Sequence, residues 1–211
     1  YFFDEKPGIL DYLLERGPGM TNIAQTLTKN GDIPPVILIG IGYTEEQRTE
    51  LTINNAPSFY EFFTDELIPQ IEEKCNVSTS SKDRVLFGYS ASAHFSTYAL
   101  MNDIYTGVET FNKFVSISGV YDSFKKATSL EEKIFQEMGE NPFSGKSLFI
   151  AVGEDDANAA LLKSHRSFTE RLISRGYPDF RLKSLEYAGK GHYDIPEFSF
   201  SEGLTWFFSE E

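Results

Sequence analysis

The stretch Arg84-Val-Leu-Phe-Gly-Tyr-Ser-Ala-Ser-Ala93 passes from a strand-forming run directly into a helix-forming one. Ser90 stands at that junction, where a sharp strand-to-helix turn would raise its hydroxyl above the end of the strand. Such a turn requires small neighbours, because strand and helix pass close together. Four nearby residues meet this need, since Gly88, Ala91, Ser92 and Ala93 are all small. The stretch therefore predicts Ser90 as a nucleophile.

The match to the G-x-S-x-G pattern of nucleophilic serines is incomplete, because Ser92 occupies the place of the last glycine. Serine keeps most of the steric requirement. The backbone N–H of Ala91, the residue after the nucleophile, would donate to a negative oxygen that develops beside Ser90. The alternative is an ordinary turn serine, so the assignment depends on the rest of the chain.

Apolar and β-branched runs recur along the chain, and helical patterns lie between them. Five strands are predicted, over residues 36–40, 84–87, 114–117, 148–152 and 181–185. Helices are predicted over 158–174 and behind Ser58, where Ser58 and Glu61 have capping-box spacing and Pro69 introduces a kink. This alternation predicts an α/β fold, with a mostly parallel sheet and helices on both faces. Sites in such folds lie beyond the carboxyl ends of the strands.

Length and composition fit one domain over residues 1–211, because 40% hydrophobic content is typical of a globular chain. Within it, we expect residues 121–146 to form a short cap over the site. A formal charge of -13 disfavours nucleic acid as a partner. Cys75 stands alone, and no apolar run reaches the roughly 20 residues of a membrane span. We expect no metal and no cofactor. The compartment stays open, since Tyr1 at the start suggests a trimmed N-terminus. The oligomeric state stays open as well.

The chain has three histidines, and His192 is the candidate general base. It lies in the glycine-containing loop 188–196, directly after the last predicted strand, where the imidazole can turn back over the sheet edge. The alternative is a surface histidine. His94 follows Ser90 by one helical turn and is expected to pack, whereas His165 lies in a polar helical stretch and is expected to be solvated.

The fourth predicted strand ends in Gly153-Glu-Asp-Asp156, which supplies three candidate acids. A carboxylate there can accept from the Nδ1–H of a histidine and stabilise the imidazolium. A solvated turn or a helix cap is the other interpretation. The order Ser90, acid, His192 is that of α/β-hydrolases and not of the chymotrypsin or subtilisin folds. In that fold the acid commonly follows such a glycine by three residues, which favours Asp156 over Glu154 and Asp155.

Almost the whole chain resembles the putative-esterase family of α/β-hydrolases. Its members include esterase D (S-formylglutathione hydrolase), feruloyl esterases, enterobactin-type siderophore esterases and antigen 85 mycolyltransferases. The resemblance is carried by Ile33–Tyr43, Phe62–Ile71, Ser116–Gly119, Gly191-His192 and Gly203-Leu204. It implies the α/β-hydrolase fold, with the nucleophile on Ser90, the base on His192 and the acid within 154–156, although some siderophore-esterase relatives work mainly with a Ser-His pair.

Two further residues are candidates for substrate contact. The siderophore-esterase branch has an arginine where this chain has Arg48, which implies a contact with substrate; a structural salt bridge is the alternative. Tyr89, directly before the nucleophile, is the second candidate.

The sequence departs from the family pattern in two places. Ser92 and Ala93 replace two glycines that commonly follow the nucleophile, which is expected to narrow the turn. The family's earlier "LLDG" strand supplies its second oxyanion donor, and here it corresponds either to Tyr1–Glu5 or to a segment upstream, so the domain as given is expected to lack N-terminal strands. The second donor is left unassigned.

Together these features predict a serine esterase that cleaves a small-molecule carboxylic ester through Ser90, His192 and Asp156, by way of an acyl-enzyme. The alternatives are an acyltransferase or thioesterase on the same triad, a serine peptidase, or a non-catalytic binding domain on a hydrolase scaffold. The identity of the ester is not readable from the sequence.

Overall fold

The computed structural model describes residues 2–3, 19–123, 125–155 and 159–209. Their centre is a six-stranded sheet in the order β2-β1-β3-β4-β5-β6, and every pairing between its described strands is parallel. The strands are β1 (Phe2–Phe3), β2 (Gly40–Ile41), β3 (Val85–Tyr89), β4 (Lys113–Ile117), β5 (Ser147–Gly153) and β6 (Arg181–Tyr187). This is the α/β fold with a parallel sheet that the sequence predicts.

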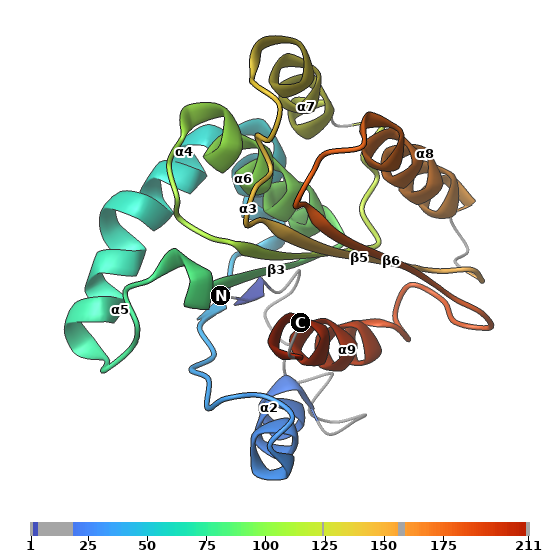
Figure 1. Cartoon of the computed structure of the whole chain (residues 1–211). Helices are drawn as coiled ribbons and strands as arrows, with labels where there is room; N and C mark the ends of the chain where they lie inside the picture. The colour runs from blue at the N-terminus through green and yellow to red at the C-terminus, as the bar shows by residue number, and fades with distance from the viewer. Residues whose placement is uncertain (1, 4–18, 124, 156–158, 210–211) are drawn as a thin grey trace.

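Helices cover both faces of the sheet, as predicted (Figure 1). One face carries α3 (Glu45–Thr49), α4 (Ala56–Phe62), α5 (Ile68–Lys74), α6 (Ala91–Thr106), α7 (Lys126–Glu137) and α8 (Ala159–Arg175). The other face carries α2 (Gly19–Asn30) and α9 (Pro196–Phe208), which pack against each other. Each layer encloses its own cluster of buried side chains. No helix in the described ranges is long and apolar enough to cross a bilayer.

The first two strands are where the sequence prediction is weakest. Residues 36–39 form no ladder, so the strand predicted over 36–40 is reduced to β2. The sequence also misses β1, which lies between β2 and β3 and pairs Phe2 with both Gly40 and Phe87. Two residues are too few for a recognisable period, and β1 forms because its neighbours supply the hydrogen bonds.

The capping box predicted at Ser58 is wrong. Helix α4 begins three residues earlier than such a box would place it, with Asn55 as N-cap and Pro57 in its first turn. Proline fits there because the first N–H groups of a helix have no intrahelical acceptor. A capping box is present at Thr44 and Gln47, where α3 begins. A short π-helical segment over Phe63–Leu67 joins α4 to α5, and Pro69 lies in the first turn of α5, so the kink predicted there stays a prediction.

The prediction that His165 is solvated is also wrong. Its side chain on α8 is 1% exposed, and its Nε2 lies 2.8 Å from Ser184 Oγ on β6. Burial lowers its pKa to about 4, so the ring is neutral near pH 7. The neighbours of His165 in sequence are polar and suggest exposure. Its partner Ser184 lies nineteen residues further along the chain, so the local sequence does not indicate the burial.

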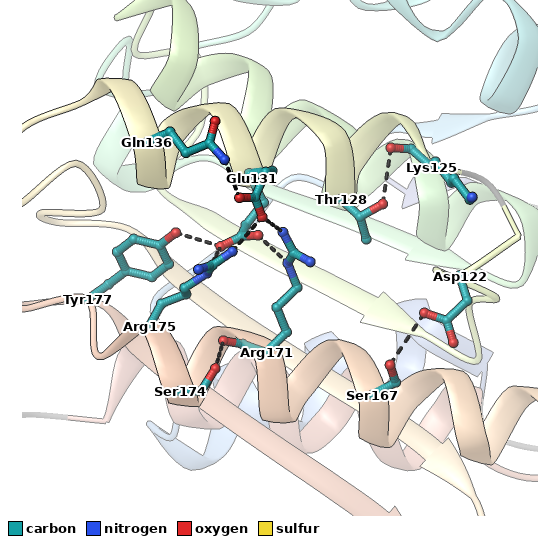
Figure 2. A network of polar contacts seen from close by, with 11 residues as sticks. Asp122, Lys125, Thr128, Glu131, Gln136, Ser167, Arg171, Ser174, Arg175 and Tyr177 are labelled. Carbon is teal, nitrogen blue, oxygen red and sulfur yellow. Dashed lines mark hydrogen bonds and ion pairs between the residues drawn. The ribbon is translucent and has the colours of Figure 1, made fainter.

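Residues 121–146 contain α7, and a network of charged side chains ties this helix to α8 (Figure 2). Glu131 of α7 is fully buried and receives hydrogen bonds from Arg171, Arg175 and Tyr177. Glu132 binds the same two arginines from the solvent side. Helix α7 also packs against α6. The segment is therefore anchored on the helical layer, and its role as a cap over the site remains a prediction.

Candidate active site

Ser90 lies in the tight turn between β3 and α6, with φ 56° and ψ -117°. A positive φ is costly for a residue with a Cβ, so the surrounding structure has to hold it. The Ser90 N–H donates to the carbonyl oxygen of Ile117 at 2.8 Å, which ties the turn to β4. The strand-turn-helix geometry that the opening stretch predicts is present, and it leaves the Ser90 side chain partly exposed.

The close approach of strand and helix explains Gly88. A Cβ at this position would overlap the backbone carbonyl oxygen of Ser92. Ser92 itself is fully buried, and its Oγ donates to the Tyr89 carbonyl oxygen at 2.8 Å and accepts from the Tyr89 N–H at 3.1 Å. The serine that replaces the usual glycine therefore fits the turn and adds two hydrogen bonds across it.

His192 meets Ser90 from a distant part of the chain. Its Nε2 lies 3.1 Å from Ser90 Oγ, within the range in which a histidine can take the hydroxyl proton. The loop that carries it follows β6, as the sequence predicts. Asp194, which sequence reasoning missed, tightens this loop because its Oδ2 accepts from the Gly191 N–H at 2.8 Å. No common turn pattern signals this contact, because an aspartate in such turns usually accepts from a residue that follows it.

Tyr89 contacts His192 in two ways. The rings lie 4.8 Å apart between centroids, inclined by 32°, and the tyrosine hydroxyl donates to the His192 carbonyl oxygen at 3.1 Å. The Tyr89 side chain is only 4% exposed. Little of the Tyr89 surface is therefore available for the predicted contact with substrate, and its side chain contacts the base, His192.

The predicted acid, Asp156, lies outside the described residues. The turn that leads to it is held against the start of the His192 loop, because the Asp155 N–H donates to the Lys190 carbonyl oxygen at 3.0 Å. Gly153 is needed there, since a Cβ on it would overlap the same oxygen. The alternatives Glu154 and Asp155 have exposed side chains. The ends of β5 and β6 thus run side by side towards Ser90 and His192.

The N-terminus of α6 provides the electrostatics at Ser90. Ala91 is its first residue, and the N–H groups of a first helical turn have no acceptor within the helix and favour negative charge. The residues after β1, from which the family's second donor would come, lie outside the described ranges.

Arg48 lies in α3, which follows the carboxyl end of β2 and so belongs to the same edge of the sheet. Its side chain is partly buried, and contact with substrate stays a prediction.

His94 is not a second base. It is buried on α6, and its Nε2 accepts from the Val120 N–H at 3.1 Å. Burial lowers its pKa to about 4, so the ring packs as a neutral group, in keeping with the sequence prediction.

A cavity of about 210 Å³ lies along α6, and His94, which follows Ser90 by one helical turn in the sequence, is part of its lining. It is bounded by α6, by the segment that follows α3 and by the start of α7, with His94, Tyr98, Thr52, Ser123, Lys125 and Lys126 among its lining residues. No group of three or more metal-ligating side chains occurs among the described residues.

Comparison with known proteins identifies the family of the chain. The family model described as "Putative esterase" matches residues 14–173. A search of curated protein sequences gave no match.

Solved structures share the fold at low identity. The BES protein from Bacillus cereus is 19% identical with a TM-score of 0.75, covering 100% of this chain and 82% of its own. An IroE-like serine hydrolase from Shewanella oneidensis is 19% identical with a TM-score of 0.76, covering 99% and 69%. The siderophore hydrolase EstA from Aspergillus nidulans is 12% identical with a TM-score of 0.71, covering 97% and 80%. Because the family model spans most of the chain, this protein belongs to the putative esterase family and is an ester-hydrolysing enzyme of the α/β-hydrolase fold.

Proposed function

We propose that the protein hydrolyses a small-molecule carboxylic ester with Ser90 as nucleophile and His192 as general base. The observation that carries this proposal is the 3.1 Å approach of His192 Nε2 to the Oγ of a serine held on a positive-φ turn. Nucleophile and base within hydrogen-bond reach, at the carboxyl edge of a parallel sheet, are the arrangement that acyl transfer needs.

In the first half-reaction, Ser90 Oγ attacks the ester carbonyl carbon while His192 Nε2 takes the hydroxyl proton. The tetrahedral oxyanion accepts from the Ala91 N–H, which the α6 N-terminus favours. The C–O bond to the alcohol then breaks, and His192 returns the proton to the leaving oxygen. In the second half, water attacks the acyl-enzyme, His192 takes a proton from it, and Ser90 leaves with that proton.

Asp156 is the acid that we assign to His192 in this mechanism. Support comes from the turn after β5, which the Asp155–Lys190 hydrogen bond holds against the His192 loop one residue before Asp156. A carboxylate there would fix the imidazole with its proton on Nδ1 and stabilise the imidazolium.

Arg48 and the lining of the 210 Å³ cavity are the places where we propose that substrate binds. Ser123, Lys125 and Lys126, from the segment predicted as a cap, form part of that lining, so this segment would select among esters. The cavity lies beside the nucleophile helix, which supports its use as a pocket for one side of the substrate.

The test is hydrolysis of p-nitrophenyl esters of increasing acyl length by wild type, Ser90→Ala and His192→Ala. Each variant should lose at least about 1,000-fold in kcat, because nucleophile and base act as a unit. Ser96→Ala, a buried serine on the same helix, is the matched control and should keep wild-type activity. Ester hydrolysis by Ser90→Ala at more than a tenth of the wild-type rate would refute the proposal. Added alcohol in the same assay distinguishes hydrolysis from acyl transfer.

A further inference from the structure

Tyr89 connects the two halves of the Ser90–His192 pair. Its backbone is bonded directly to Ser90, and its side chain lies against the His192 ring and donates to the His192 carbonyl oxygen. A shift of Tyr89 therefore moves nucleophile and base together. The inference drawn from this contact deepens the proposed function and rests on it.

Ser92 fixes the backbone of Tyr89 from the other side. Its hydroxyl both donates to the Tyr89 carbonyl oxygen and accepts from the Tyr89 N–H. Water does not compete for these two hydrogen bonds, because Ser92 is fully buried and Tyr89 is nearly so. A glycine at position 92 would leave the Tyr89 backbone without this bridge.

We propose that Tyr89 and Ser92 are positioning residues for the reaction: Ser92 fixes Tyr89, and Tyr89 holds the His192 loop at its working distance from Ser90. The loop needs such a support, since Gly189 and Gly191 precede the histidine and Gly189 adopts a positive φ. Misplacing a catalytic group by about 1 Å can cost on the order of 100-fold in rate.

The burial of Tyr89 separates this role from substrate binding. A residue that binds substrate changes KM when it is altered, whereas a residue that aligns the base changes kcat. Tyr89 has almost no exposed surface. Its effect is therefore expected in kcat and in the rate of Ser90 acylation.

Tyr89→Phe removes the hydroxyl and keeps the ring, so it tests the hydrogen bond to His192 alone. We expect kcat for p-nitrophenyl acetate to fall about tenfold with KM within twofold and a melting temperature lowered by no more than about 4 °C. The matched control is Tyr105→Phe, which loses a hydroxyl bonded to Glu137 on the surface and should match wild type. An unchanged kcat in Tyr89→Phe, or a rise in KM alone, overturns the proposal.

A double-mutant cycle with His192→Ala shows whether Tyr89 acts through the histidine. If it does, Tyr89→Phe changes the residual rate of His192→Ala less than twofold. A tenfold loss in both backgrounds would mean that Tyr89 acts on something else and would overturn the inference. This result is separable from failure of the proposed function, in which His192→Ala itself would retain wild-type activity.

Ser92→Ala keeps the volume close to that of serine and removes both hydrogen bonds to Tyr89. We expect a loss of kcat at least as large as that of Tyr89→Phe, with Ser96→Ala unchanged. The double variant Ser92→Ala/Tyr89→Phe should lose less than the product of the single losses, because the two residues act in series. A loss of kcat in the double variant equal to the product of the two single losses would show that the residues act independently and would contradict the proposal.

Discussion

Replacing Glu131 by alanine should lower the free energy of unfolding more than replacing an exposed glutamate by alanine. The carboxylate is fully buried between α7 and α8 and accepts from Arg171, Arg175 and Tyr177 (Figure 2). Removing one partner of a buried ion pair costs roughly 3–5 kcal/mol. Both arginine side chains are partly exposed and can recover water, so we expect the lower end, about 3 kcal/mol. For a domain of this size that is a fall of roughly 6–12 °C in melting temperature.

Glu132→Ala is the matched control, since Glu132 is the next residue, binds the same arginines, and has a side chain that is 40% exposed. Water and salt screen an exposed ion pair, which predicts a much smaller shift in melting temperature than for Glu131→Ala. Thermal unfolding followed by circular dichroism, with urea unfolding for the free energies, compares the two variants. Equal shifts for the two variants would refute the claim that the buried carboxylate anchors α7.

The remaining predictions concern acid stability, the turn and the acid. His94 and His165 have pKa values lowered to about 4 in the fold, against about 6.5 unfolded; their contribution is present above pH 6.5 and is lost as pH falls towards 4. Each then costs on the order of 3 kcal/mol, and His165→Gln should flatten the acid limb of a stability profile; an unchanged limb would contradict this. Gly88→Ala should abolish phosphonate labelling of Ser90, because its Cβ overlaps the Ser92 carbonyl; full labelling would show that the turn can widen. Asp156→Asn should lower kcat at least about 100-fold. An equal loss in Asp155→Asn would contradict the assignment of Asp156 as the acid.

The sequence predicts the later part of the sheet well, because β3, β4 and β5 each carry their own apolar run, while β6 mixes apolar with polar residues. The runs around Leu86, Val115 and Ile150 face helices on both sides, so burial alone marks them as strands. The turn at Ser90 was predictable for a similar reason. Its small residues are contiguous, and the steric requirement that they satisfy is local.

What the sequence could not predict depends on partners from elsewhere in the chain. β1 exists only because β2 and β3 pair with it, and His165 is buried only because Ser184 lies opposite. Ser92 read as a departure from a pattern, whereas its hydroxyl bridges the Tyr89 backbone. Tyr89 and His192 are 103 positions apart in the sequence, and no periodic pattern predicts their contact.

The proposed mechanism requires that the hydroxyl of Ser90 is the atom that reacts. Treating the protein with a fluorophosphonate and mapping the adduct by peptide mass spectrometry tests this directly, with Ser90→Ala and His192→Ala treated in parallel. We expect one modified residue, Ser90, no adduct in Ser90→Ala and labelling slowed by at least about 100-fold in His192→Ala. An adduct on another residue, or undiminished labelling of Ser90→Ala, would contradict it.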